Sequence, residues 1–273
     1  MINSQLLDHA CALRDQGKFG EAYDEFLRAA NHTDSILEKA GILLNAVTTL
    51  TQSGKYELAR KHLDTVRGLL SDRKMGSLGP SEQNEFIGIT VSVEVEEAEI
   101  LTSEGRFEEA IKKFTDTLKQ YEQQLKERGL FEISDDVQMR RAFLWADMGS
   151  FEKAKPSLEE LEYRQSENPL FLFYLGHCYV VTKDSSRARQ KLEKAISIGM
   201  KPQLAFQAHC SLGMALYELG EYSKAKEEFE RGIQTAPPRY IAEAKIWKWL
   251  QYTCLSLGLN DEAEHYRRLS EPH

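Results

Sequence analysis

A short pattern of small, aromatic and apolar residues recurs seven times along the chain. In the complete pattern a glycine is followed by an aromatic residue two positions later, an alanine five positions later and an apolar residue nine positions later; the fifth copy departs from it at Ser185, and the seventh departs at Asn260 and Arg267. The first copy reads Gly17, Phe19, Ala22 and Phe26. The fifth copy has Lys183 in place of the glycine. The alanines of the later copies are Ala59, Ala110, Ala154, Ala188, Ala225 and Ala263.

The spacing within each copy predicts two antiparallel helices joined by a tight turn. Glycine commonly ends a helix, because it adopts the left-handed conformation without steric strain. The alanine and the apolar residue four positions later lie on one face of the next helix, and the small alanine lets the two helices approach closely. The predicted pairs are 3–15 with 19–30, 34–52 with 56–70, 82–103 with 107–128, 135–147 with 151–164, 168–181 with 185–198, 201–218 with 222–235 and 239–256 with 260–270.

The period of the pattern indicates a repeat protein. Successive alanines lie 37, 51, 44, 34, 37 and 38 residues apart, close to the roughly 34 residues of a helix–turn–helix repeat. Two intervals around the third unit exceed 34 residues by 17 and 10, so we expect longer helices and loops there. Residues 71–81 contain Gly76, Gly79 and Pro80 and are expected to form a mobile connector or a disordered segment.

Further positions carry a family resemblance. A small residue lies seven positions before the turn glycine and a bulky one four before it: Ala10 with Leu13, Ala98 with Leu101, Ala142 with Trp145, Gly176 with Tyr179, and Gly213 with Leu216. Prolines near the unit boundaries are Pro169, Pro202 and Pro237. From about Asn3 to Ser270 the chain resembles the tetratricopeptide repeat family. The departures are Val47 and Gln251 in the small position, and Glu94 and Glu97 where apolar residues are expected.

The resemblance implies an all-α fold, a right-handed superhelical solenoid of antiparallel helix pairs with about 14 helices. It implies one solenoid domain over residues 1–273, because each unit of a solenoid buries its face only against its neighbours. The expected units cover about 3–30, 34–70, 82–128, 135–164, 168–198, 201–235 and 239–270, with the loop at 71–81.

Composition narrows the function classes. Hydrophobic residues make up 41% of the chain and charged residues 29%, which is typical of a soluble globular protein. The net charge of −8 argues against nucleic-acid binding, which needs a positive surface. The longest apolar run, 169–181, is too short to span a bilayer, and the first twenty residues lack a signal peptide's apolar stretch.

The four cysteines give no sign of a metal site or a redox pair. Cys11, Cys178, Cys210 and Cys254 lie far apart and inside predicted helices, where a free thiol behaves as a small apolar group. We therefore expect no metal and no cofactor, and a reducing, cytoplasmic location.

The resemblance also predicts a binding surface. In the family, residues ten, six and three before the turn glycine line a concave groove, and here most of them are apolar, aromatic or methionine in the C-terminal half, with His177 and Lys248 as polar members. We expect the partner-binding groove to include Met139, Phe143, Phe173, His177, Met214, Tyr217, Lys248 and Tyr252. Such a groove suits an amphipathic helix or an apolar peptide. The alternatives are that these side chains pack between units, or that another segment of the chain fills the groove.

The corresponding face in the N-terminal half is more polar. Between Met75 and Gly105 there are seven glutamates and no lysine or arginine: Glu82, Glu85, Glu94, Glu96, Glu97, Glu99 and Glu104. They form either an acidic strip that steers a basic partner or, as we favour, a solvated helix face.

Catalysis has little support in the sequence. His177 is a conceivable general base, but the spacing places no serine, cysteine or carboxylate beside it, and the chain has no phosphate-binding glycine loop or zinc motif. The prediction is a non-enzymatic scaffold whose groove binds a peptide or helical segment of a partner protein. The alternatives are a regulatory, peptide-sensing protein and, less favoured, an enzyme on a helical-repeat frame.

Overall fold

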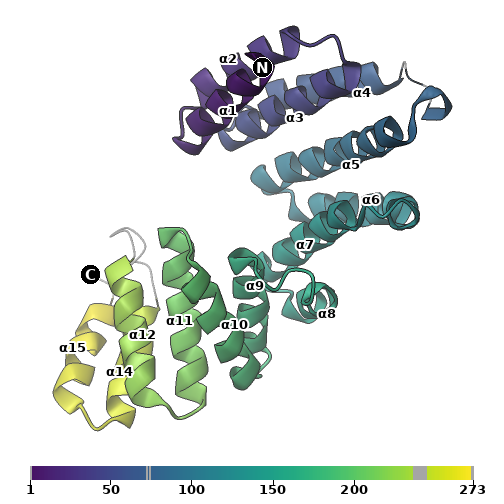
Figure 1. The fold of residues 1–273 in the computed structure, drawn as a ribbon. Coiled ribbons are helices and arrows are strands. Elements are labelled where there is room, and N and C mark those ends of the chain that lie inside the picture. Colours follow the sequence, from purple (N-terminus) through teal and green to yellow (C-terminus); the bar gives the residue numbers. More distant parts are fainter. Residues whose placement is uncertain (1, 72, 74, 236–244, 272–273) are drawn as a thin grey trace. The chain divides into compact units, whose positions relative to one another are not determined.

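The computed structural model describes residues 2–71, 73, 75–235 and 245–271. All regular elements in these ranges are helical (Figure 1), which confirms the all-α prediction. The chain forms two compact units, residues 1–144 and 145–273. We describe each unit by itself, and the expectation of a single solenoid domain stays a prediction.

Unit 1 contains three helix pairs and most of α7. Helix α1 (Ile2–Asp15) packs on α2 (Phe19–Asn31), α3 (Ile36–Gln52) on α4 (Tyr56–Ser71), and α5 (Pro80–Ser103) on α6 (Phe107–Glu127). The next helix, α7 (Phe131–Asp147), contains the boundary between the units. Neighbouring pairs are joined by contacts of α2 with α3 and of α5 with both α3 and α4.

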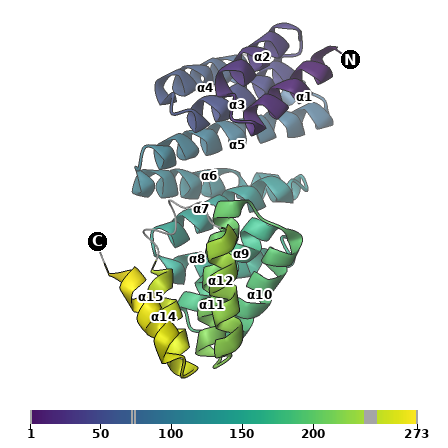
Figure 2. The same ribbon diagram turned by 90° about the vertical axis from the view of Figure 1, so that its left-hand side faces the viewer.

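Unit 2 begins at the end of α7 and continues with α8 (Phe151–Leu161). Helix α9 (Pro169–Val181) packs on α10 (Ser185–Ile198), α11 (Pro202–Glu218) on α12 (Tyr222–Thr235), and α14 (Ile246–Ser256) on α15 (Asn260–Ser270). Helix α11 contacts α9, α10, α12 and α14, so it lies at the centre of unit 2 (Figure 2).

The helix ends agree closely with the sequence pattern. The second helices of five pairs begin at the aromatic residue of the pattern, as at Phe19 and Tyr222. The extra residues around the third unit are used in long helices, of 24 residues in α5 and 21 in α6. Helix α7 begins at Phe131, four residues before the predicted start, and the expected helix segment 239–244 lies outside the described residues.

The expected loop at 71–81 joins α4 to α5. Helix α4 ends at Ser71, a short 3₁₀ turn covers Met75–Ser77, and α5 begins at Pro80. Glu82 accepts a hydrogen bond from the backbone N–H of Gly79 at 3.0 Å and so caps the start of α5. Leu78 is buried, which anchors the described part of this connection to unit 1.

The turns explain why glycine recurs in the pattern. Gly17 has a φ of 76°, its N–H bonds to the carbonyl of Arg14, and the N–H of Lys18 bonds to the carbonyl of Leu13 at 2.9 Å. This is the Schellman arrangement, which satisfies the last carbonyls of a helix. At the other turns, too, the N–H of the residue after the turn residue bonds to the carbonyl five positions earlier. This includes the fifth turn, where Lys183 replaces glycine and adopts a φ of 63°.

We expect the turn glycines to resist substitution. Gly220 has a φ of 77°, so Gly220→Ala should lower the free energy of unfolding by about 1–2 kcal/mol, the cost of a left-handed non-glycine residue. Gly20→Ala is the matched control, because Gly20 lies within α2 and the space that its new methyl group would occupy is open, and it should stabilise by about 0.5–1 kcal/mol. Urea unfolding measures both; equal effects would contradict this account of the turn.

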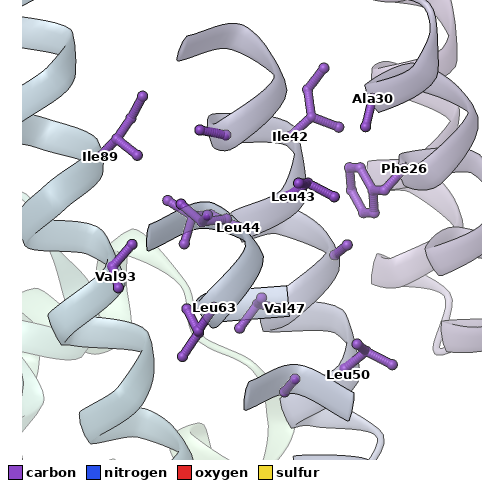
Figure 3. Packing of buried hydrophobic residues seen from close by; sticks show 14 of the residues in the cluster. Phe26, Ala30, Ile42, Leu43, Leu44, Val47, Leu50, Leu63, Ile89 and Val93 are labelled. Atoms are coloured by element: carbon purple, nitrogen blue, oxygen red, sulfur yellow. The ribbon is translucent and has the colours of Figure 1, made fainter. Parts of the chain in front are cut away.

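The small residues of the pattern lie at helix–helix contacts. Ala22, Ala59 and Ala110 are fully buried. Figure 3 shows the corresponding packing in unit 1, where Phe26 of α2 lies beside Leu43 of α3. In unit 2 a Cβ on Gly213 would lie 2.6 Å from the ring of Phe229, so α11 and α12 approach closely only because position 213 has no side chain.

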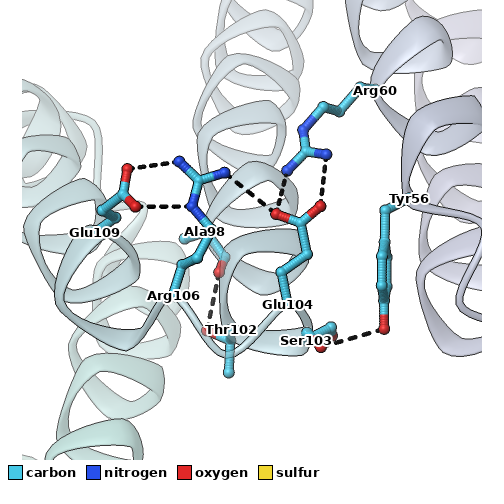
Figure 4. A network of polar contacts seen from close by, with 8 residues as sticks. All are labelled: Tyr56, Arg60, Ala98, Thr102, Ser103, Glu104, Arg106 and Glu109. Atoms are coloured by element: carbon cyan, nitrogen blue, oxygen red, sulfur yellow. Dashed lines mark hydrogen bonds and ion pairs between the residues drawn. The ribbon is translucent and has the colours of Figure 1, made fainter.

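Four of the seven glutamates between Met75 and Gly105 form ion pairs with arginine or lysine. Arg67 and Lys113 both contact Glu94 and Glu97, while Arg140 contacts Glu99. Arg60 donates two hydrogen bonds, of 2.7 and 2.6 Å, to Glu104 and so ties α4 to the end of α5 (Figure 4). These four glutamates therefore form neither a free acidic strip nor a simply solvated face, because neighbouring helices provide their counter-ions, whereas Glu82 and Glu85 are exposed.

Candidate functional site

Unit 2 contains a cavity of about 530 Å³. It lies between the first helices of successive pairs, and its walls come from the end of α7, α9, α11 and α14, with Phe151 of α8 and Phe229 of α12. Six of its lining residues are large aromatics: Phe151, Phe173, Tyr174, Phe206, Phe229 and Trp249. Cavities that are mostly apolar and carry a few polar groups are the usual form of ligand sites.

Aromatic contacts hold much of the wall in place. The ring of His177 lies 5.4 Å from Phe151, edge to face, and 6.0 Å from Phe173, stacked. Trp249 of α14 stacks on Phe229 at 6.3 Å, which fixes one wall against α12. Met214 of α11 is half-buried on the same cavity, and its flexible thioether can adapt to differently shaped partners.

The polar groups of the cavity are few and mostly bonded. The Tyr174 hydroxyl donates to Asp147 at 2.9 Å. Burial raises the pKa of Asp147, and burial together with the Asp147 charge raises the pKa of Tyr174. Burial also raises the pKa of the Cys210 thiol to about 12, so this cysteine stays protonated at neutral pH and is a poor nucleophile.

The structure gives His177 a partner that the sequence spacing does not reveal. Its Nδ1 lies 3.0 Å from the Oγ of Ser211, 34 positions away on α11. Burial lowers the pKa of His177, so the ring is neutral at pH 7. Ser211 is buried inside α11, where the amides bond to carbonyls of the same helix and cannot form an oxyanion hole. The arrangement therefore resembles a structural hydrogen bond more than a nucleophile and its base.

Three of the eight expected groove residues, Phe173, His177 and Met214, line this cavity. Tyr217 lies outside the lining set, with its ring 5.5 Å from Trp249. Lys248 and Tyr252 are exposed, and the Lys248 ammonium lies 5.9 Å from the Tyr252 ring centre.

The other two expected residues belong to unit 1. Met139 and Phe143 are half-buried on α7. They are absent from the lining of the unit 2 cavity.

The sequence reasoning missed several lining residues. Tyr174, Ser211 and Trp249 lie nine positions before their turn residues, whereas the expected groove positions lie ten, six and three before them. Phe206 and Gln207 lie one helical turn earlier on α11. Extending the expected groove positions by one helical turn toward the start of each helix would have included Phe206 and Gln207.

Unit 1 has a cavity of about 540 Å³ between α3, α5 and the start of α7. Its polar lining residues are Asn45, Thr48, Asn84, Glu85, Ser92 and Glu96. Glu96 accepts a hydrogen bond from Thr48 at 2.8 Å, and burial raises the pKa of Glu96 to about 7. The two cavities therefore differ in chemistry: aromatic side chains dominate the lining of the unit 2 cavity, whereas the lining of the unit 1 cavity has two glutamates and no aromatic residue.

Other chemistry is sparse in the described part of the chain. All four cysteines are free thiols. The described residues contain no group of three or more histidine, cysteine, aspartate or glutamate side chains placed to hold a metal ion. None of the described helices is both long and apolar enough to cross a bilayer.

Known proteins resemble the chain in sequence motif and in fold. Residues 146–205 and 206–239 match two sequence models of the tetratricopeptide repeat. No curated protein sequence matches the chain.

Three solved structures illustrate the similarity of fold. A signal-transduction ATPase with a tetratricopeptide repeat sensor from Pyrococcus horikoshii has a TM-score of 0.68 and 14% identity, over 96% of this chain and 41% of its own. The APC/C hetero-tetramer Cut9–Hcn1 has a TM-score of 0.64 and 16% identity, over 96% of this chain and 45% of its own. MamA has a TM-score of 0.52 and 19% identity, over 67% of this chain and 90% of its own.

At these identities the solved structures establish the fold alone. The sequence matches over residues 146–239 and the recurring glycine turns point to the same family as the fold. Residues 146–239 match the tetratricopeptide repeat in sequence, and the described helix pairs have the fold of tetratricopeptide repeat proteins.

Proposed function

We propose that this protein is a non-enzymatic scaffold that binds a segment of a partner protein, with an apolar side chain of that segment in the unit 2 cavity. The observation that carries the proposal is the aromatic wall of the cavity, built from four first helices of successive pairs and Phe151 and Phe229. Aromatic and methionine side chains are enriched in the buried centres of protein interfaces, and a few such anchors carry most of the binding energy.

The polar rim supports an extended or helical peptide as the occupant. Asp147 lies at one part of the lining and Lys245 at another, so the cavity offers a carboxylate and an ammonium around an apolar floor. A segment with an apolar anchor flanked by charged residues complements this arrangement. The net charge of −8 adds no attraction for nucleic acid.

We favour a non-enzymatic role because the polar groups of the cavity lack a catalytic arrangement. The thiol of Cys210 is held protonated, and Ser211 lies inside a helix whose amides are already bonded. A cytoplasmic location, expected from the four free thiols, stays a prediction.

Peptide selection with cavity variants tests the proposal. A random 16-residue phage-displayed library is selected on the full chain, and the enriched peptides are measured by calorimetry. We expect enrichment of peptides with a leucine or an aromatic anchor. Met214→Arg should weaken their binding at least tenfold, because the new side chain fills the cavity with charge. Ile198→Arg is the matched control, since Ile198 is 41% exposed at the end of α10.

Two results would count against the proposal. One is a selection that yields no specific peptide. The other is a set of peptides that bind Met214→Arg as tightly as the unsubstituted chain, or that lose as much affinity with Ile198→Arg. Thermal unfolding of both variants shows whether a loss of affinity reflects unfolding instead.

A further inference from the structure

Glu96 differs from the other glutamates near it on α5. Glu94 and Glu97 contact Arg67 and Lys113, and Glu99 contacts Arg140. Glu96 forms no ion pair with any described residue, and its one hydrogen bond to a described residue is from the Thr48 hydroxyl to Oε1. Its second oxygen, Oε2, therefore remains available to a ligand.

The surroundings of Glu96 favour a cation. It lines the unit 1 cavity together with Glu85, and that lining contains neither lysine nor arginine. The Thr48 hydroxyl is also 3.1 Å from the carbonyl of Leu44, and its single proton serves only one acceptor at a time. A half-buried carboxylate with this limited support is costly to ionise, which agrees with its raised pKa. A positive ligand would offset that cost.

The two arginines near Glu96 form their hydrogen bonds with other residues, Arg14 with Asn45 of the same cavity and Arg140 with Asp136 and Glu99. Arg14 of α1 donates to Asn45 Oδ1 at 3.3 Å, and its guanidinium carbon lies 5.7 Å from the Phe26 ring centre. Arg140 of α7 donates to Asp136 and to Glu99 at 2.7 and 2.8 Å. Both arginines favour the ionised form of Glu96 from a distance, and Glu99 opposes it, but neither arginine forms a bond with Glu96.

We propose that Glu96 binds the ammonium group of a lysine side chain from a protein segment that occupies the unit 1 cavity. Lysine fits better than arginine because Oε1 already accepts the Thr48 hydroxyl and only Oε2 has both acceptor positions open, whereas a guanidinium binds best to two carboxylate oxygens at once. The cavity, of about 540 Å³, lies within the size range of sites that hold small ligands.

This proposal rests on the proposed scaffold function in one respect, namely that the lysine belongs to a protein. Its test uses single amino-acid derivatives and does not involve the unit 2 cavity, so the two proposals can fail separately.

Carboxylate NMR of the full chain tests the contact directly. The protein is labelled with ¹³C-glutamate, and Nα-acetyl-lysine methylamide is compared with the norleucine analogue, which has the same carbon chain without the ammonium. We expect the lysine probe to shift the Glu96 resonance and to move its titration midpoint to lower pH. The norleucine probe should leave both unchanged.

Variants distinguish a specific contact from general attraction of positive charge. Glu96→Gln should weaken binding of the lysine probe at least tenfold. Glu85→Gln removes one negative charge from the exposed edge of the same cavity. It should change the affinity for the lysine probe less than twofold. The proposal is overturned by a Glu96→Gln variant that still binds, by equal losses in both variants, by equal binding of the norleucine probe, or by tighter binding of the corresponding arginine derivative. Circular dichroism melts confirm that both variants are folded.

Discussion

Replacing Phe229 by alanine should lower the free energy of unfolding by about 3–5 kcal/mol, the usual range for removing a buried aromatic side chain. Phe229 is fully buried, faces Gly213 on α11 and stacks on Trp249 of α14. Its ring thus contacts α11 and α14 from α12 and joins three helices of unit 2. Urea unfolding followed by tryptophan fluorescence measures the loss.

Leu255→Ala provides the matched control for this variant. Leu255 is 50% exposed on α14, so its truncation should change stability by less than about 0.5 kcal/mol. If Phe229→Ala lowers the free energy of unfolding no more than Leu255→Ala does, the described close packing of α11, α12 and α14 is contradicted.

Glu96 should make the protein less stable as the pH rises. Its pKa is raised from 4.5 to about 7, so between these values the folded chain holds more protons at this site than the unfolded chain. Stability therefore falls with rising pH through this window, by about 3.4 kcal/mol at most at 1.36 kcal/mol per pKa unit. Glu96→Gln keeps a partner for Thr48 and carries no charge, so its stability relative to the unsubstituted chain should increase from pH 4.5 to pH 8.

The measurement is urea unfolding of both proteins at several pH values, with Glu85→Gln as the control. The control should follow the unsubstituted chain, because Glu85 is exposed at the edge of the same cavity. Parallel stability curves for Glu96→Gln and the unsubstituted chain would contradict the account of Glu96.

The helices could be predicted from the sequence because the features that define them are local. A glycine such as Gly17 or Gly220 ends a helix through its own backbone conformation, and an alanine such as Ala22 is selected by contact with the preceding helix. Both signals recur at fixed spacing, so the pattern located most helix ends within a few residues. The start of α7 lacks such a signal, and there the prediction was four residues late.

The site was harder to predict because its contacts join different repeats. The contact between His177 and Ser211 spans 34 residues, and nothing in either helix alone indicates it. Likewise, the sequence shows Glu94, Glu96 and Glu97 as similar residues. Only the packing of α5 against its neighbours gives two of them arginine and lysine partners and places the third on a cavity.

The central claim is that a partner segment occupies the unit 2 cavity, and methionine-methyl NMR tests it most directly. The full chain has six methionines, of which Met214 lines this cavity and Met75 lies in unit 1. With the ¹³C-methyl label, saturation with the tightest selected peptide should shift the Met214 signal and leave the Met75 signal in place. A peptide that binds while the Met214 signal stays unchanged would contradict the account.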